Sequence, residues 1–138
     1  MSRLIIIMIN NGDIVKTINN SGEYITGVVE KLNDFYITNY FDLFDDVGNT
    51  IGFTKQYVKI NQNLCAKKLV HIPLGDIFEY DVFTTPSGVH FYVYFDYQSM
   101  SILYVAESGK TIDDHMNIYD CKLVGNLILD QVLSNLFD

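Results

Sequence analysis

The sequence predicts a mainly β fold (α+β), with an antiparallel sheet or small barrel of about seven to nine strands and one C-terminal amphipathic helix. Over residues 4–105, apolar residues fall in short runs that turn-forming residues separate, which is typical of strands. The spacing changes over residues 123–137, where Asn126, Asp130 and Ser134 recur every four residues as one polar face. This recurrence indicates a helix with an apolar stripe on its other side.

Length and composition favour one domain over residues 1–138. The chain has 138 residues, of which 49% are apolar, so it can bury a core of its own. The polar stretch 61–68 marks a weak boundary between a small-barrel-like half, 1–60, and a half made of a hairpin and the helix, 69–138. Each half is small for independent folding, so we expect a single domain.

The first half is expected to be a series of strands joined by tight turns. Residues 4–9 are wholly apolar and mostly β-branched, which is typical of a strand buried on both faces. Asn11 and Gly12 both tolerate positive φ and so favour a turn into the second strand. The expected strands are 4–9, 13–18, 23–32, 35–44 and 50–60, followed by a loop or short helical turn over 61–68.

The second half contains the clearest alternation in the chain, over residues 89–97. Phe91 and Val93 point to one face of this strand, whereas His90, Tyr92 and Tyr94 point to the other. The expected strands are 69–72, 77–83, 89–97 and 101–106. The helix over 123–137 must bury its wide apolar face against the sheet or, in a homo-oligomer, against a second subunit.

The charge balance is acidic, and this bears on the kind of partner. Acidic residues number 17 and basic residues 9, which gives a formal charge of −8. A negative field repels phosphate backbones and attracts basic protein surfaces. The sequence therefore favours a partner protein with a basic surface over nucleic acid.

The cysteines and the N-terminal apolar run bear on location. Cys65 and Cys121 fit no metal or redox spacing, so we expect two free thiols in a reducing, cytoplasmic compartment. Residues 4–9 are too few for an export signal or a membrane span. We therefore expect no membrane association.

No motif in the sequence assigns catalytic residues, a metal or a cofactor. His115 follows Asp113 and Asp114, which superficially suggests a metal site. However, no second His or Glu follows at the spacing of one helical turn, so an acidic surface turn is the better interpretation. We therefore expect a non-enzymatic protein.

The leading functional hypothesis is binding of a partner protein through an aromatic patch with an acidic rim. The predicted contact residues are His90, Tyr92 and Tyr94, which share one strand face, with Asp96 at the rim. Tyrosine suits such a patch because it buries a large area and keeps a hydroxyl for hydrogen bonds. Phage- or mobile-element-encoded inhibitors and immunity factors are protein classes of this kind.

Residues 4–60 also resemble an Sm-like small β-barrel. The residues that carry the resemblance are Asn11-Gly12, Gly27-Val28, Asp34 and Asn39, followed by the return strand 51–60. The chain is similar in this respect to the short Sm-like proteins that tailed phages encode. The resemblance implies an oligomeric small barrel. The basic-glycine pair that completes the family's uridine pocket is absent, so RNA binding does not follow.

Two alternatives remain open on the sequence. In the first, an Sm-like or SH3-like barrel oligomer contacts nucleic acid through Lys55, Tyr57 and Lys59, which share one strand face. Lysines that protect an exposed strand edge from aggregation explain this pattern equally well. In the second alternative, a pocket between sheet and helix binds or hydrolyses a small molecule such as a nucleotide.

Overall fold

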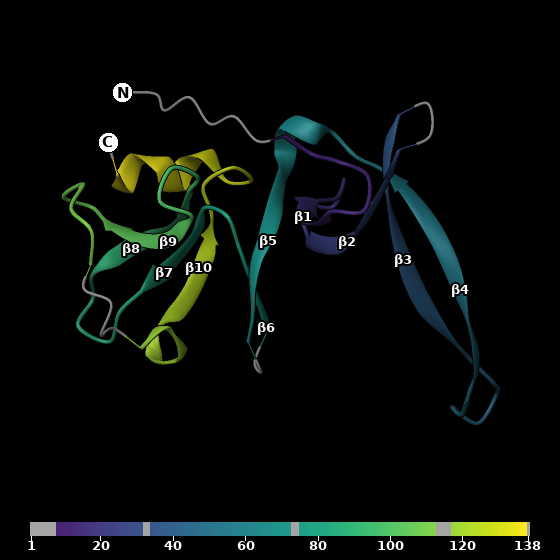
Figure 1. The fold of residues 1–138 in the computed structure, drawn as a ribbon. Coiled ribbons are helices and arrows are strands. Elements are labelled where there is room, and N and C mark those ends of the chain that lie inside the picture. The colour runs from purple at the N-terminus through teal and green to yellow at the C-terminus, as the bar shows by residue number, and fades with distance from the viewer. Residues whose placement is uncertain (1–7, 32–33, 73–74, 113–116, 138) are drawn as a thin grey trace.

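The mainly β class is confirmed by a computed structural model, which describes residues 8–31, 34–72, 75–112 and 117–137. Within these residues the chain forms ten strands in two antiparallel sheets and three short 3-10 helices (Figure 1). The first sheet contains β1 (Ile14–Ile18), β2 (Tyr24–Lys31), β3 (Phe35–Phe44), β4 (Thr50–Lys59), β5 (Cys65–Ile72) and β6 (Gly75–Phe78). The second contains β7 (Asp81–Thr84), β8 (His90–Asp96), β9 (Ser101–Ala106) and β10 (Lys122–Asn126). The 3-10 helices are η1 (Gln62–Leu64), η2 (Ile118–Asp120) and η3 (Gln131–Leu136).

The six-stranded sheet is a meander that turns back on itself without closing. Its strand order is β4-β3-β2-β1-β5-β6, so η1 carries the chain from the β4 edge back to the far side of β1. Among the described residues β4 pairs with β3 alone, so the small-barrel alternative is wrong in its closed form. The concave face still encloses a core of buried side chains from five segments of the chain. They are Ile9, Val15, Val29, Ile37 and Cys65.

The four-stranded sheet has the order β10-β7-β8-β9 and is covered on both faces. Phe91 and Val93 pack on one face with Ile77 of β6, as the alternation predicts. Tyr92 lies on the other face, and the sequence does not decide whether that face is covered. In the structure Tyr92 packs there against Leu127. Because both faces are buried, the alternation in β8 marks two cores rather than a core and a surface.

The strand expected over 77–83 is wrong as a single element. β6 ends at Phe78 and pairs with β5, whereas β7 begins at Asp81 and pairs with β8. Between them, Tyr80 adopts a φ of 65°, which is uncommon for a residue other than glycine. The Asp81 carboxylate accepts the backbone N–H of Phe78 at 2.9 Å, and this contact holds the turn that breaks the strand.

The C-terminal amphipathic helix expected over 123–137 is also wrong. Its first residues form β10, and only the short η3 follows. The polar residues that suggested a helical period have separate local roles. Asn126 is fully buried, Asp130 caps η3 by accepting the N–H of Val132, and the Ser134 hydroxyl donates to the Gln131 carbonyl. No helix among the described residues has the length and apolar character needed to cross a bilayer.

Two further expectations concern the chain before and within the first sheet. β5 begins at Cys65, four residues earlier than the sequence predicts, because Lys67 and its neighbours pair with β1. Residues 4–7 of the predicted first strand and the 113–115 acidic turn lie outside the described residues. Ile9, at the end of that predicted strand, is buried in the core of the first sheet.

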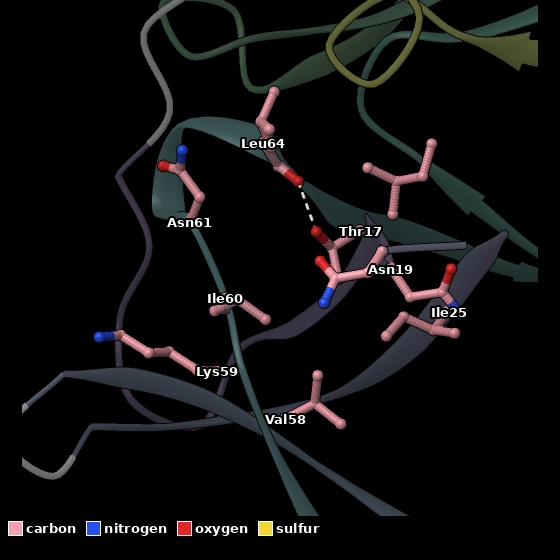
Figure 2. Close-up of a pocket in the computed structure, with 10 residues that line it drawn as sticks. Thr17, Asn19, Ile25, Val58, Lys59, Ile60, Asn61 and Leu64 are labelled. Carbon is pink, nitrogen blue, oxygen red and sulfur yellow. Dashed lines mark hydrogen bonds between the residues drawn. The ribbon is translucent and has the colours of Figure 1, made fainter. Parts of the chain in front are cut away.

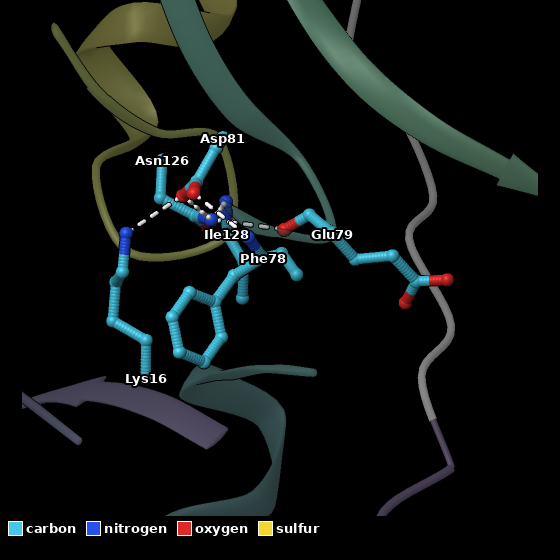
Figure 3. A network of polar contacts seen from close by, with 6 residues as sticks. All are labelled: Lys16, Phe78, Glu79, Asp81, Asn126 and Ile128. Carbon is cyan, nitrogen blue, oxygen red and sulfur yellow. Dashed lines mark hydrogen bonds and ion pairs between the residues drawn. The ribbon is translucent and has the colours of Figure 1, made fainter. Parts of the chain in front are cut away.

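A buried polar network joins the two sheets (Figure 3). Lys16 of β1 donates to Asp81 Oδ1 of β7 at 2.8 Å, and both side chains are almost fully buried. Asn126 of β10 also donates to Asp81 Oδ1, at 2.9 Å, and to the Glu79 carbonyl. The Asn126 side-chain oxygen accepts the N–H of Ile128, so each side-chain group in the network has a partner.

Burial and the ion pair with Lys16 shift the pKa of Asp81 in opposite directions. Burial raises the pKa of the Asp81 carboxyl, and the nearby Lys16 ammonium is the largest opposing influence. The Lys16 ammonium also lies 4.9 Å from the centre of the Phe78 ring, which adds a cation–π contact. Removing the lysine would leave a buried carboxylate without a counter-charge, which is costly in a protein interior.

We predict that Lys16→Met lowers the free energy of unfolding by about 3–5 kcal/mol, because Asp81 would stay buried without its partner. Urea unfolding followed by circular dichroism measures the loss. Lys59→Met is the matched control, because Lys59 pairs with Asp34 at the surface and its removal should cost under about 1 kcal/mol. Equal losses in the two variants would contradict the role of the buried contact.

A second prediction concerns Glu79, whose side chain is buried and accepts the Tyr97 hydroxyl at 3.1 Å. Burial raises the pKa of Glu79 above its ordinary value of 4.5. The folded protein therefore holds this proton more tightly than the unfolded chain. The contribution of the protonated Glu79 carboxyl to the free energy of unfolding is complete below pH 4.5. It is lost as the pH rises through the folded-state pKa of Glu79.

We therefore expect the wild type to lose stability relative to Glu79→Gln as the pH rises from about 4.5 to about 7. Denaturant unfolding of both proteins across this range gives the difference. Glu23→Gln, at an exposed turn, should run parallel to the wild type. A constant difference between wild type and Glu79→Gln would show that Glu79 does not titrate in this way.

Candidate functional site

The predicted aromatic patch on β8 is largely covered. Tyr92 is 8% exposed, and its ring packs edge-on against Phe137 with the centroids 5.0 Å apart. Tyr94 is half-buried and lies edge-on to Tyr80 at 6.0 Å. The C-terminal segment thus occupies the face on which the sequence places a partner.

The other two residues of that patch have local partners. His90 Nδ1 lies 2.8 Å from the Thr84 hydroxyl, and the His90 backbone N–H donates to the Glu107 carboxylate. Asp96 accepts the N–H of Gln98 and the hydroxyl of Ser99, which fixes the β8–β9 turn. The structure therefore places His90 and Asp96 at opposite ends of β8, with buried Tyr92 between them.

The predicted basic strand face lies on β4 and is exposed. Lys55 and Tyr57 are brought together, with the ammonium 5.1 Å from the ring centre. Lys55 also lies 3.5 Å from Glu30, and Lys59 lies 3.1 Å from Asp34. Each lysine is thus matched by a carboxylate, which weakens the attraction that this face would have for a phosphate backbone.

The β3–β4 hairpin extends beyond the strands that it pairs with in the first sheet. β3 pairs with β2 over Phe35–Thr38, and the rest of its length pairs with β4 alone. The hairpin continues as a two-stranded ribbon that extends away from the second sheet (Figure 1). The ribbon comprises residues 39–56, which include the turn.

The far end of this ribbon carries a group of exposed apolar side chains, which we call the ribbon tip. Their exposed fractions range from 45% to 81%. The residues of the ribbon tip are Leu43, Phe44, Val47, Ile51 and Phe53. A cluster of this kind on a projecting element is typical of a binding surface, whereas single exposed apolar residues are common on any protein.

The turn of the ribbon tip is ordered and carries negative charge. The Asp45 carboxylate accepts the N–H of Val47 at 3.0 Å and that of Asn49 at 2.9 Å. These backbone contacts, led by Asn49, lower the pKa of Asp45, so its charge persists at mildly acidic pH. Gly48 has a φ of 89°, which suits this turn. Asp46 is also exposed, so the turn places negative charge next to the apolar residues of the ribbon tip.

Sequence reasoning missed the ribbon tip, although a signal was present. Leu43 and Phe44 are adjacent, so in a strand they point to opposite faces, and both immediately precede an acidic turn. Ile51 follows the same turn. Apolar residues on both faces of a strand end, beside a turn that must lie at the surface, indicate side chains that one sheet does not bury.

The two thiols and the acidic residues bear on chemistry. Burial raises the pKa of Cys65 and of Cys121, which favours the unreactive thiol form. Both cysteines are free. In the described part of the chain, no group of three or more His, Cys, Asp or Glu side chains is placed to hold a metal ion.

Comparisons of the chain with protein-family models, curated proteins and solved structures found no match.

The exposure of the ribbon tip leads to a prediction about stability. Phe44→Ser and Ile51→Ser should each change the free energy of unfolding by less than about 1 kcal/mol, because neither side chain is in a core. Ile37→Ala, in the buried part of β3, should lower the free energy of unfolding by about 2–5 kcal/mol. Thermal or urea unfolding of the three variants measures this contrast. A large loss from the tip substitutions would mean that these residues serve the fold.

Proposed function

We propose that this protein is a non-enzymatic interaction protein that binds a partner protein through the ribbon tip. The observation that carries the proposal is the group of five exposed apolar residues on a projecting, acidic hairpin. This surface replaces the β8 face as the proposed contact, because Tyr92 is buried. The partner is proposed to offer an apolar cleft with a basic rim.

The energetics of exposure support this proposal. Burying one Phe or Ile side chain contributes roughly 1.5–3 kcal/mol, so Phe44, Ile51 and Phe53 together offer enough for specific binding even after the costs of association. The charge of −8 on the whole chain adds a field that speeds encounter with a basic surface. The ribbon therefore combines an apolar contact with electrostatic guidance.

The shape of the ribbon supports a particular mode of binding. A narrow two-stranded projection can enter a cleft that the body of the protein could not reach. By analogy of class alone, the protein is proposed to be a phage- or mobile-element-encoded inhibitor or immunity factor. The cytoplasmic location also remains a prediction.

The first test uses a photo-crosslinking amino acid at Phe44 or Ile51, in the cells that naturally make the protein. Both positions should capture the same polypeptide. Tyr119 is the control position, because it is similarly exposed but lies in η2 of the second half. Capture of that polypeptide with equal yield from Tyr119 would contradict binding at the tip.

The second test is a titration of the captured protein, once purified. Phe44→Ser should weaken binding by at least about tenfold, because it removes a central apolar contact. Asp46→Lys should slow association and reduce its dependence on salt. The matched control is Glu23→Lys, at the exposed β1–β2 turn. Binding that neither Phe44→Ser nor Asp46→Lys changes, in affinity or in association rate, would contradict the proposal.

A further inference from the structure

A cavity of about 430 Å³ opens beside η1, at the end of the first sheet (Figure 2). Its volume is within the range of small-molecule sites in proteins. The walls come from four separate segments, because β1, β2 and the end of β4 meet here beneath η1. The apolar wall residues are Ile18, Ile25, Val58, Ile60 and Leu64, and all five are half-buried.

The cavity lies at the gap that the unclosed sheet leaves. β4 ends at Lys59 without pairing with β5, and η1 spans the distance between them. The Thr17 hydroxyl donates to the Leu64 carbonyl at 2.7 Å, which fastens η1 to β1 at one side of the opening. The walls are thus preformed, which lowers the cost of binding.

One polar group at the mouth, the Asn19 amide, points toward the other wall residues (Figure 2). The Asn19 side-chain oxygen accepts the N–H groups of Ser21 and Glu23, both at 2.9 Å. These contacts settle which end of the amide is oxygen, so its NH₂ group is an oriented donor that has no protein acceptor within the described residues. The Asn61 side-chain oxygen accepts the N–H of Asn63 at 3.0 Å, and its amide is turned away from the cavity.

The donor in the wall favours an acceptor oxygen over a cation. Among the described lining residues, Lys59 is the one that is ionisable, and its ammonium points away from the cavity and lies 3.1 Å from Asp34. A bound ammonium group would face the Asn19 amide donor, whereas a bound carbonyl or carboxylate oxygen would accept from it.

We propose that this cavity binds an aliphatic chain that ends in a carbonyl or carboxylate oxygen. The aliphatic part contacts the isoleucine and leucine walls, and the oxygen accepts a hydrogen bond from the Asn19 amide. A free fatty acid and the aliphatic C-terminal residue of a peptide share this chemistry. The site is independent of the ribbon tip, which lies at the other end of β4.

The test follows isoleucine and leucine methyl signals by NMR while ligands are added to the full chain. Octanoate and octanamide should give saturable shifts at Ile25 and Ile60, whereas octylammonium should bind at least about tenfold more weakly. An acetylated Gly-Leu dipeptide provides the peptide arm. Stronger binding of octanoate assigns a fatty acid, and stronger binding of the dipeptide assigns a peptide C-terminus.

The matched variants use two asparagines whose side-chain oxygens accept backbone N–H groups. Asn19→Asp keeps an oxygen for the N–H groups of Ser21 and Glu23 but replaces the NH₂ donor with a charged acceptor, so octanoate binding should weaken at least about tenfold. Asn117→Asp makes the same change at the cap of η2, where the side chain likewise accepts a backbone N–H, and should have no effect. Ile25→Phe should fill the cavity and reduce binding of both eight-carbon ligands.

Three results would overturn the proposal. The first is the absence of saturable shifts with octanoate, octanamide and the dipeptide at millimolar concentrations. The second is octylammonium binding as tight as that of octanoate. The third is equal octanoate affinity in Asn19→Asp and Asn117→Asp, which would mean that the Asn19 amide does not contact the ligand.

Discussion

The contact between Lys16 and Asp81 determines how the two sheets fit together. A buried ion pair is favourable only when its geometry is good and its remaining hydrogen-bonding groups are satisfied. Here Asn126 and the Phe78 N–H supply those remaining bonds, so strands from both sheets and the C-terminal segment are fixed at one point. The same carboxylate turns the chain from β6 into β7. One residue therefore specifies both a local turn and the relation between the sheets.

This arrangement also decides which surfaces stay open. The second sheet has one face against β5 and β6 and the other against the C-terminal segment, so its aromatic residues form cores. The first sheet is filled on its concave side by residues such as Val15 and Ile37. Among the described residues, the projecting ribbon and the gap beside η1 stay open. Both follow because, in this part of the chain, β4 pairs with β3 alone.

Most strands could be predicted from sequence because turn residues and apolar runs are local signals. β3 has the predicted bounds, and the turn after it is where the Asp-rich segment places it. The helix failed because Asn126 and Asp130 recur at a helical spacing for unrelated reasons: one is buried in a network and the other is a cap. Strand order and distant partners such as Lys16 and Asp81 depend on the whole fold. The sequence could not decide whether the Tyr92 face is covered, for the same reason.

The two-stranded ribbon has a thermodynamic consequence of its own. An isolated pair of strands is marginal in water, and beyond Thr38 the ribbon has no third strand among the described residues to support it. Its amide protons should exchange with solvent through local opening, well before the body of the protein unfolds. A partner that bound the ribbon tip, as proposed, would also suppress that opening, and the ordering of the ribbon would cost conformational entropy. Such a penalty favours complexes that form readily and come apart again, rather than permanent ones.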